Sequence, residues 1–115
     1  MSAEISGKVL VTGGSGFLGI NLIRYLFAKG LTDVRSLDLV EFDYPEKDRV
    51  DAVVGDIRDE AMVAKCMQGV AYVIHCAAAL PLYPEDDIYT TDVIGTRIVL
   101  AAAHKAGVQR CVMIS

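Results

Sequence analysis

The 115-residue sequence has few cysteines, and their arrangement marks neither a metal site nor a disulfide framework. Cys66, Cys76 and Cys111 share no metal-ligand spacing and form no C-x-x-C motif, and each lies in an apolar neighbourhood. This pattern favours small buried thiols in a reducing compartment. We therefore expect no metal site and a packing role for all three side chains.

The sequence also lacks an apolar run of membrane-spanning length, and its first residues lack the charged and apolar regions of a signal peptide. Positive charge is not in excess, because 11 Lys and Arg against 15 Asp and Glu give a net charge of −4. Nothing in that balance indicates a nucleic-acid or membrane surface. Since 53% of the residues are hydrophobic, we expect one globular, cytoplasmic domain that buries roughly two-thirds of its unfolded surface.

Glycine is concentrated in one stretch, the segment KVLVTGGSGFLG at positions 8–19. It is typical of a buried strand over 9–12, a glycine turn and the start of a helix. The glycines fit two patterns: G-x-G-x-x-G at Gly14, Gly16 and Gly19, and T-G-x-x-G-x-x-G at Thr12, Gly13, Gly16 and Gly19. One glycine turns the chain, one lets backbone amides approach a pyrophosphate, and one lets the helix pack close to the strand. The stretch predicts an anion site at the helix N-terminus.

Other glycine-loop functions fit less well. No Lys-Ser or Lys-Thr follows Gly19, so the stretch is not a Walker A loop, and no kinase-type strand lysine motif follows downstream. A plain strand-to-helix turn with surplus glycine is the remaining alternative. The flanking strand and helix patterns favour the phosphate loop over it.

The rest of the chain alternates helical and strand patterns, with no internal repeat. We expect helices over 17–29, 59–67 and 88–106, further strands over 34–37, 52–54, 71–76 and 110–114, and loops over 39–49 and 77–87. Gly30, Gly69 and Gly107 stop the three helices. The alternation predicts an α/β fold with a doubly wound parallel sheet of strand order 3-2-1-4-5.

That order leaves the sheet unevenly covered. The first helix covers one face and the later helices cover the other, so half of the first face has no layer. The fifth strand, CVMI at 111–114, is apolar yet lies at an edge, which proteins usually protect. We therefore expect the chain to be a piece of a larger protein, or a partner to supply the missing layer.

Six motifs in order resemble one family. They are Val11–Gly19, Asp38, Gly55-Asp56-Ile57 with Asp59, Val73–Ala78 (VIHCAA), Val93–Thr96 (VIGT) and Arg110–Ser115 (RCVMIS). Together they resemble the extended short-chain dehydrogenase/reductases, the NAD-dependent epimerase/dehydratase group. The resemblance covers nearly the whole chain and implies a Rossmann-type sheet that binds NAD. In the loop it implies cofactor contacts from Gly13, Gly16, Phe17, Leu18 and Gly19.

Asp38 corresponds to the acid that binds the ribose in the family. It lies 19 residues after Gly19, close to the roughly 20 expected for the acid that bonds the ribose 2′-hydroxyl. A carboxylate there would repel the 2′-phosphate of NADP, and the next basic residue is Lys47. NAD is therefore favoured over NADP. The alternative role for Asp38 is to cap a loop.

The resemblance implies further contacts at the ends of the third and fourth strands. Asp56 would accept a hydrogen bond from the adenine amino group, with Ile57 against the ring, unless Asp56 caps the next helix. Asp59 is better placed for that cap. Small side chains at Cys76, Ala77 and Ala78 would let the cofactor lie close to the backbone.

Three other positions have less direct implications. His75 ends a buried strand and is expected to be a packed histidine rather than a base, and His104 is expected at the surface. Asp92 stands where the family usually has Asn, and because a carboxylate only accepts hydrogen bonds, any contact that needs the amide donor is in doubt.

We do not identify the family's catalytic pair in the sequence. Tyr25 is the one tyrosine with a lysine four residues later, Lys29, and both lie in the first predicted helix; the family's Ser or Thr would fall at or beyond Ser115. We expect no catalysis from this chain alone. As part of a longer enzyme, a homodimer, it would bind NAD and a small-molecule substrate for hydride transfer at a sugar or alcohol carbon; the alternative is a non-catalytic NAD(P)-binding sensor or scaffold module.

Overall fold

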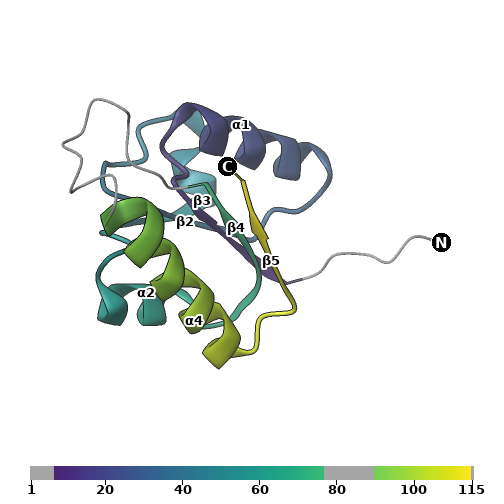
Figure 1. Cartoon of the computed structure of the whole chain (residues 1–115). Helices are drawn as coiled ribbons and strands as arrows, with labels where there is room; N and C mark the ends of the chain where they lie inside the picture. Colours follow the sequence, from purple (N-terminus) through teal and green to yellow (C-terminus); the bar gives the residue numbers. More distant parts are fainter. Residues whose placement is uncertain (1–6, 77–89, 115) are drawn as a thin grey trace.

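A computed structural model of the chain describes residues 7–76 and 90–114 (Figure 1). Its elements run in the order β1 (Lys8–Thr12), α1 (Phe17–Ala28), β2 (Val34–Asp38), the 3-10 helix η1 (Pro45–Arg49), β3 (Val50–Val54), α2 (Glu60–Cys66), β4 (Val70–His75), the π-helical segment η2 (Thr90–Gly95), α4 (Thr96–Ala106) and β5 (Arg110–Met113). The five strands form one parallel sheet in the order β3-β2-β1-β4-β5. The predicted strand order is confirmed.

The sheet separates two hydrophobic cores because successive side chains of a buried strand point to opposite faces. In β1, Val9 and Val11 pack with α1, whereas Leu10 packs with the core beneath α2 and α4. Figure 1 shows α1 on one side of the sheet and α2 and α4 on the other. Both faces of the central strand are therefore covered.

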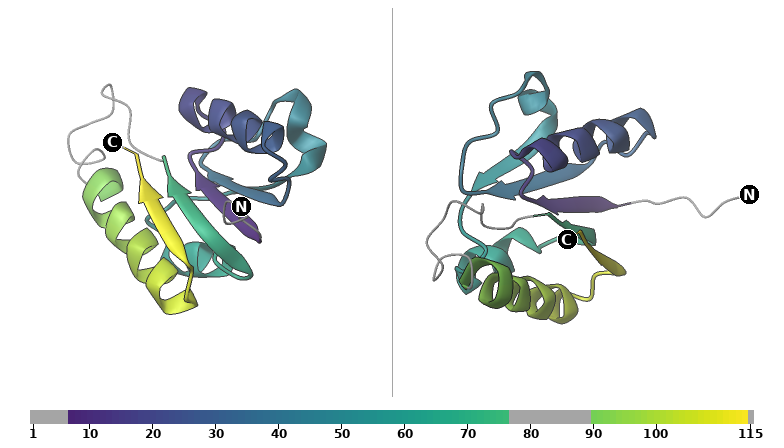
Figure 2. Two further views of the ribbon diagram at one scale, coloured as in Figure 1. Left: turned by 90° about the vertical axis from the view of Figure 1, so that its right-hand side faces the viewer. Right: turned by 45° about the horizontal axis from the view of Figure 1, so that its top comes forward.

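The strand edge at β5 is exposed, as the sequence predicts (Figure 2, left). Val112 and Met113 are 45% and 49% exposed. Val112 lies beside Ile74 of β4, on the α1 side of the sheet. On that side α1 covers the sheet over β1 and β2, and the surface over β4 and β5 has no helix in the described part of the chain.

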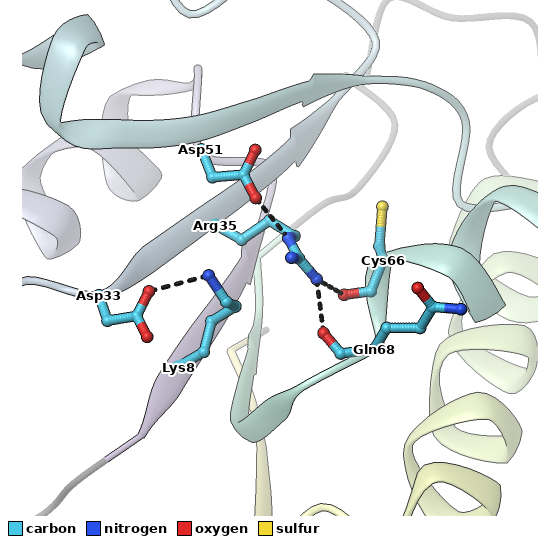
Figure 3. A network of polar contacts seen from close by, with 6 residues as sticks. All are labelled: Lys8, Asp33, Arg35, Asp51, Cys66 and Gln68. Atoms are coloured by element: carbon cyan, nitrogen blue, oxygen red, sulfur yellow. Dashed lines mark hydrogen bonds and ion pairs between the residues drawn. The ribbon is translucent and has the colours of Figure 1, made fainter.

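A polar network fastens the amino ends of the strands (Figure 3). Arg35 bonds Asp51 on the neighbouring strand at 2.8 Å and donates to the carbonyl oxygens of Cys66 and Gln68 at 2.7 and 2.9 Å. These carbonyls lie at the C-terminal end of α2, where a helix leaves its acceptors unpaired. The network thus joins α2 to β2 and β3 and leaves the opposite, carboxyl ends of the strands to the candidate site.

Several element boundaries differ from those predicted by one or two residues, and the described part of the helix predicted over 88–106 consists of the π-helical segment η2 followed by α4. The 39–49 segment contains the short helix η1, where Pro45 stands at the helix start, a position that suits a residue without an N–H group. β3 begins at Val50, two residues earlier than predicted, because all of 50–54 pairs with β2. The predicted loop over 77–87, with Ala77 and Ala78, lies outside the described residues.

Candidate functional site

The predicted site residues lie at the carboxyl ends of neighbouring strands. Thr12 ends β1, Asp38 ends β2, and Asp56 follows β3. The parallel register pairs Thr12 with Leu37 on one side and with His75 on the other. In open α/β sheets, ligands bind in the crevice at this end, beside the point where the strand order reverses. That point is here between β1 and β4.

At three positions of the loop, glycine is favoured for three different reasons. Gly13 has φ +76°, which serves the sharp turn after β1. A Cβ on Gly19 would collide with backbone atoms of Gly13 and Gly14, so Gly19 lets α1 pack against the loop. A Cβ on Gly16 would meet no atom of the described residues closer than 3.4 Å. Packing alone does not require glycine at position 16, and a ligand that approaches the backbone would.

Gly14 has a different role from the one its pattern suggests. A Cβ there would collide with the side chain of Ser36, which is buried at 1% exposure under the loop, and would lie 3.2 Å from Ile23. Gly14 therefore serves packing inside the protein. The T-G-x-x-G-x-x-G pattern describes this turn better than G-x-G-x-x-G.

The loop presents backbone donors at the start of α1. The amide of Gly13 donates to Leu37 O at 2.7 Å and that of Gly16 to Gly13 O at 3.1 Å. Within the described part of the chain, the N–H groups of Phe17 and Leu18 have no acceptor. No acidic side chain occupies the first turn of α1. The positive end of the helix dipole and these two donors can therefore receive an anion.

Asp38 lies directly beside this loop. Its Oδ2 accepts from the amide of Ser15 at 3.0 Å, and its Oδ1 accepts from the amide of Val40 at 3.3 Å. Asp38 thus has the loop-capping contacts that the sequence left open as an alternative. A carboxylate can accept about four hydrogen bonds, so these two contacts leave capacity for a ligand hydroxyl.

Asp56 is held by a neighbour that the sequence reading missed. Both Oδ atoms accept from Arg58 Nε at 3.0 Å, and Nη2 of Arg58 lies 2.6 Å from Oδ2. The Arg58 guanidinium lowers the pKa of Asp56, so the carboxylate is ionised at neutral pH. Asp59 caps α2 by accepting from the Met62 amide at 3.2 Å, as expected. The signal for the pair was the spacing Asp-x-Arg at a strand end.

Ile57 is more buried than a ring-stacking residue would be. It is 5% exposed and belongs to the core beneath α2 and α4. A Cβ on Gly95 would collide with it, so the end of η2 lies directly against its side chain. Its predicted contact with adenine remains a prediction that depends on its backbone and a small exposed surface.

The end of β4 is tied to the end of β1 by hydrogen bonds. The amide of Cys76 donates to the carbonyl oxygen of Thr12 at 3.0 Å and to its hydroxyl at 3.1 Å. His75 is 4% exposed, with Nδ1 2.6 Å from Thr12 Oγ1 and Nε2 3.0 Å from Thr96 Oγ1. The expected packed histidine is confirmed. His104 is exposed, also as expected.

The three cysteines have the packing environments expected of them. Cys66 is buried, Cys76 and Cys111 are half-buried, and none forms a disulfide. Burial raises the pKa of each thiol, so all three are protonated at neutral pH. The described residues contain no cluster of His, Cys, Asp and Glu able to hold a metal. None of the helices described is long and apolar enough to cross a bilayer.

Comparison with known proteins identifies the family. The model of the 3-beta hydroxysteroid dehydrogenase/isomerase family matches residues 10–115. The chain belongs to this family. It is 38% identical over 114 residues to a 3-beta-hydroxysteroid dehydrogenase of Mycolicibacterium neoaurum, covering 92% of this chain and 31% of the relative. It is 40% identical over 109 residues to a putative dihydroflavonol 4-reductase of Synechocystis, covering 91% and 31%.

Solved structures place this family member among the extended short-chain dehydrogenase/reductases. An Agrobacterium tumefaciens protein of the superfamily with bound NAD has a TM-score of 0.81 at 32% identity, covering 92% of this chain and 31% of that one. A Thermus thermophilus UDP-glucose 4-epimerase in complex with NAD has a TM-score of 0.80 at 28% identity, covering 90% and 36%. The expected family and Rossmann fold are confirmed. The chain spans about a third of the length of these relatives.

Proposed function

We propose that residues 1–115 form the NAD-binding Rossmann portion of an enzyme that transfers a hydride at a sugar or alcohol carbon. The observation that carries the proposal is the contact between the Ser15 amide and Asp38, which joins the phosphate loop to the ribose-binding acid of the family at 3.0 Å. The NAD complexes of similar structures support NAD as the cofactor. When bound, NAD would accept a hydride from the substrate carbon.

The diphosphate, one ribose and the adenine of the dinucleotide each have a fitting group among the described residues. The amides of Phe17 and Leu18 would bind the diphosphate, with Gly16 allowing its close approach. Asp38 would accept from a ribose hydroxyl. Asp56 would accept from the adenine amino group, since its carboxylate is ionised. Half-buried Cys76 follows β4, on the side expected for the rest of the cofactor.

The chemistry of the substrate rests on the relatives alone. Their names are those of a hydroxysteroid dehydrogenase, a dihydroflavonol reductase and a sugar-nucleotide epimerase. Oxidation or reduction at an alcohol carbon is common to such activities. The one Tyr-x-x-x-Lys pair of the sequence, Tyr25 and Lys29, lies at the end of α1 opposite the glycine loop. The proposal for the 115-residue chain is therefore binding, and hydride transfer is proposed for a protein of its relatives' length.

Calorimetric titration of the chain with NAD and NADP tests the proposal. We expect NAD to bind more tightly than NADP, because the Asp38 carboxylate would repel a 2′-phosphate. Asp38→Asn should weaken NAD binding about tenfold or more, since hydrogen bonds to a charged group contribute about 1.5–3 kcal/mol. It should also bring the affinities for NAD and NADP closer together.

Asp43→Asn is the matched control. Asp43 is exposed in the same segment and has no hydrogen bond to the described residues, so this variant should bind NAD like the unmodified chain. Absence of NAD binding, or equal loss in the two variants, would contradict the proposed function.

A further inference from the structure

Ser15 is the residue of the phosphate loop that the rest of the protein holds most firmly. It lies between Gly14 and Gly16, which have no side chains to restrain the loop. Three contacts reach Ser15 from residues 38–44: its amide donates to Asp38, its hydroxyl donates to Val40 O at 3.2 Å, and its carbonyl accepts from the Tyr44 hydroxyl at 2.7 Å. All polar groups of Ser15 are therefore engaged by one segment.

Tyr44 is itself fixed on α1. Its ring meets Phe42 edge to face, with centroids 5.2 Å apart and planes at 67°, and Phe42 is only 6% exposed. The guanidinium of Arg24 on α1 lies 5.7 Å from the centre of the Tyr44 ring. Arg24 also bonds Glu46 through Nε at 2.6 Å and through Nη2 at 3.3 Å. The Tyr44 hydroxyl thus reaches the loop from a rigid base.

We propose that Tyr44 is a positioning residue for the diphosphate of the dinucleotide. This inference rests on the proposed function and names a residue that acts through Ser15. The Ser15 carbonyl and the Gly16 N–H belong to one planar peptide group, so the Tyr44 hydrogen bond sets its orientation. That peptide leads directly into the amides of Phe17 and Leu18. A loop ordered before binding spares the ligand the cost of ordering it.

The segment also joins two parts of the ligand site. It starts at Asp38, the acid proposed for the ribose, and its tyrosine holds the loop proposed for the diphosphate. Residues 38–44 therefore fix the ribose subsite and the diphosphate subsite relative to each other. Loss of the Tyr44 hydroxyl should free the loop that would bind the diphosphate. It should leave Asp38, which would bind the adenosine ribose, in place.

Removal of the hydroxyl alone, in Tyr44→Phe, tests the proposal because the ring and its packing remain. Affinities of the 115-residue chain for NAD, ADP-ribose and adenosine are measured by NMR titration. We expect Tyr44→Phe to weaken NAD and ADP-ribose about three- to tenfold, the net value of one hydrogen bond, and to change adenosine binding less than about twofold.

Tyr72→Phe is the matched control. It removes a tyrosine hydroxyl that donates to the Gln109 side chain at 3.2 Å, away from the loop, and should leave all three affinities unchanged. A second measurement is amide hydrogen exchange without ligand. The Ser15 and Gly16 amides, which donate to Asp38 and to Gly13 O, should exchange faster in Tyr44→Phe, and exchange in the strands should be unchanged.

The outcomes separate the inference from the proposed function. Absence of NAD binding by the unmodified chain contradicts the proposed function and this inference with it. NAD binding that Tyr44→Phe leaves unchanged, or that falls by the same factor for adenosine, contradicts the inference alone. Loss confined to the two diphosphate ligands, with faster loop exchange, supports it.

Discussion

At the scale of single residues, the two acids of the site differ in what surrounds them. Asp38 accepts from two backbone amides, at 3.0 and 3.3 Å. Asp56 faces the cation of Arg58, which lowers its pKa, and the pair is about one-third exposed. Asp38 is therefore held by the loop that it would serve, whereas Asp56 is oriented and kept charged by a side chain two residues further along.

The Asp56–Arg58 pair predicts a pH-dependent contribution to stability. Because the pKa of Asp56 is lowered in the folded state, the contribution is present above the unfolded pKa of about 3.9 and is lost as pH falls through the lower folded value. Arg58→Gln should cost about 0.5–1 kcal/mol near pH 7, as for partly exposed ion pairs.

Urea unfolding between pH 3 and pH 7 measures this effect. The difference in unfolding free energy between Arg58→Gln and the unmodified chain should begin to narrow as the pH falls below about 4, where Asp56 is protonated in the unfolded chain. It should vanish only below the lower pKa of the folded state. Arg97→Gln, at an exposed position on α4, should show no such pH dependence. A gap of constant size across the range would contradict the assignment.

At the scale of elements, the unit of β1, the glycine loop and α1 separates packing from binding. Gly19 has backbone atoms of the loop where a side chain would be. Among the residues that the structure describes, a Cβ on Gly16 would meet only Gly13 O, at 3.4 Å. One glycine is thus needed for α1 to pack against the loop. The other is needed only if something outside the protein approaches it.

Two alanine variants test that division. Gly19→Ala should destabilise the chain by about 1–3 kcal/mol, as overpacking does. Gly16→Ala should keep or slightly raise stability, because φ −83° and ψ 171° suit alanine. It should nevertheless weaken NAD binding about tenfold or more. Thermal unfolding and calorimetric titration measure the two effects, and equal destabilisation by both variants would contradict the division.

The elements themselves were largely predictable from the sequence. Helix and strand patterns, with glycine stops at positions such as Gly107, gave all five strands and their order. The 39–49 segment was predicted only as an acidic loop. Its order comes from the burial of Phe42 in the α1 core and from the hydrogen bond of Tyr44 to Ser15, 29 residues away, and no local pattern indicates either contact.

At the scale of the whole molecule, α1 on one side of the sheet and α2 and α4 on the other leave the surface unevenly covered (Figure 2). Tyr72 and Ile74 lie at the margin of the α1 core, and Val112 beside them is 45% exposed. The sequence predicts a further layer over this surface, from more chain or from a partner. That remains a prediction.

Part of the candidate site was predictable from the arrangement of the whole sheet. The carboxyl ends of parallel strands meet at one edge of the sheet, so Asp38, Asp56 and the glycine loop had to lie near one another once the strand order was known. Side chains that reach across, such as Arg58 and Tyr44, depend on turn and loop geometry. Sequence spacing does not specify that geometry.

The most direct test of the central claim is an amide NMR titration of the chain with NAD. The account predicts that the largest shift changes fall on Gly16, Phe17, Leu18 and Gly19 and on the amides around Asp38. The network of Lys8, Arg35 and Gln68 at the opposite ends of the strands should not change (Figure 3). Changes confined to that far end, or no change at 16–19, would contradict the account.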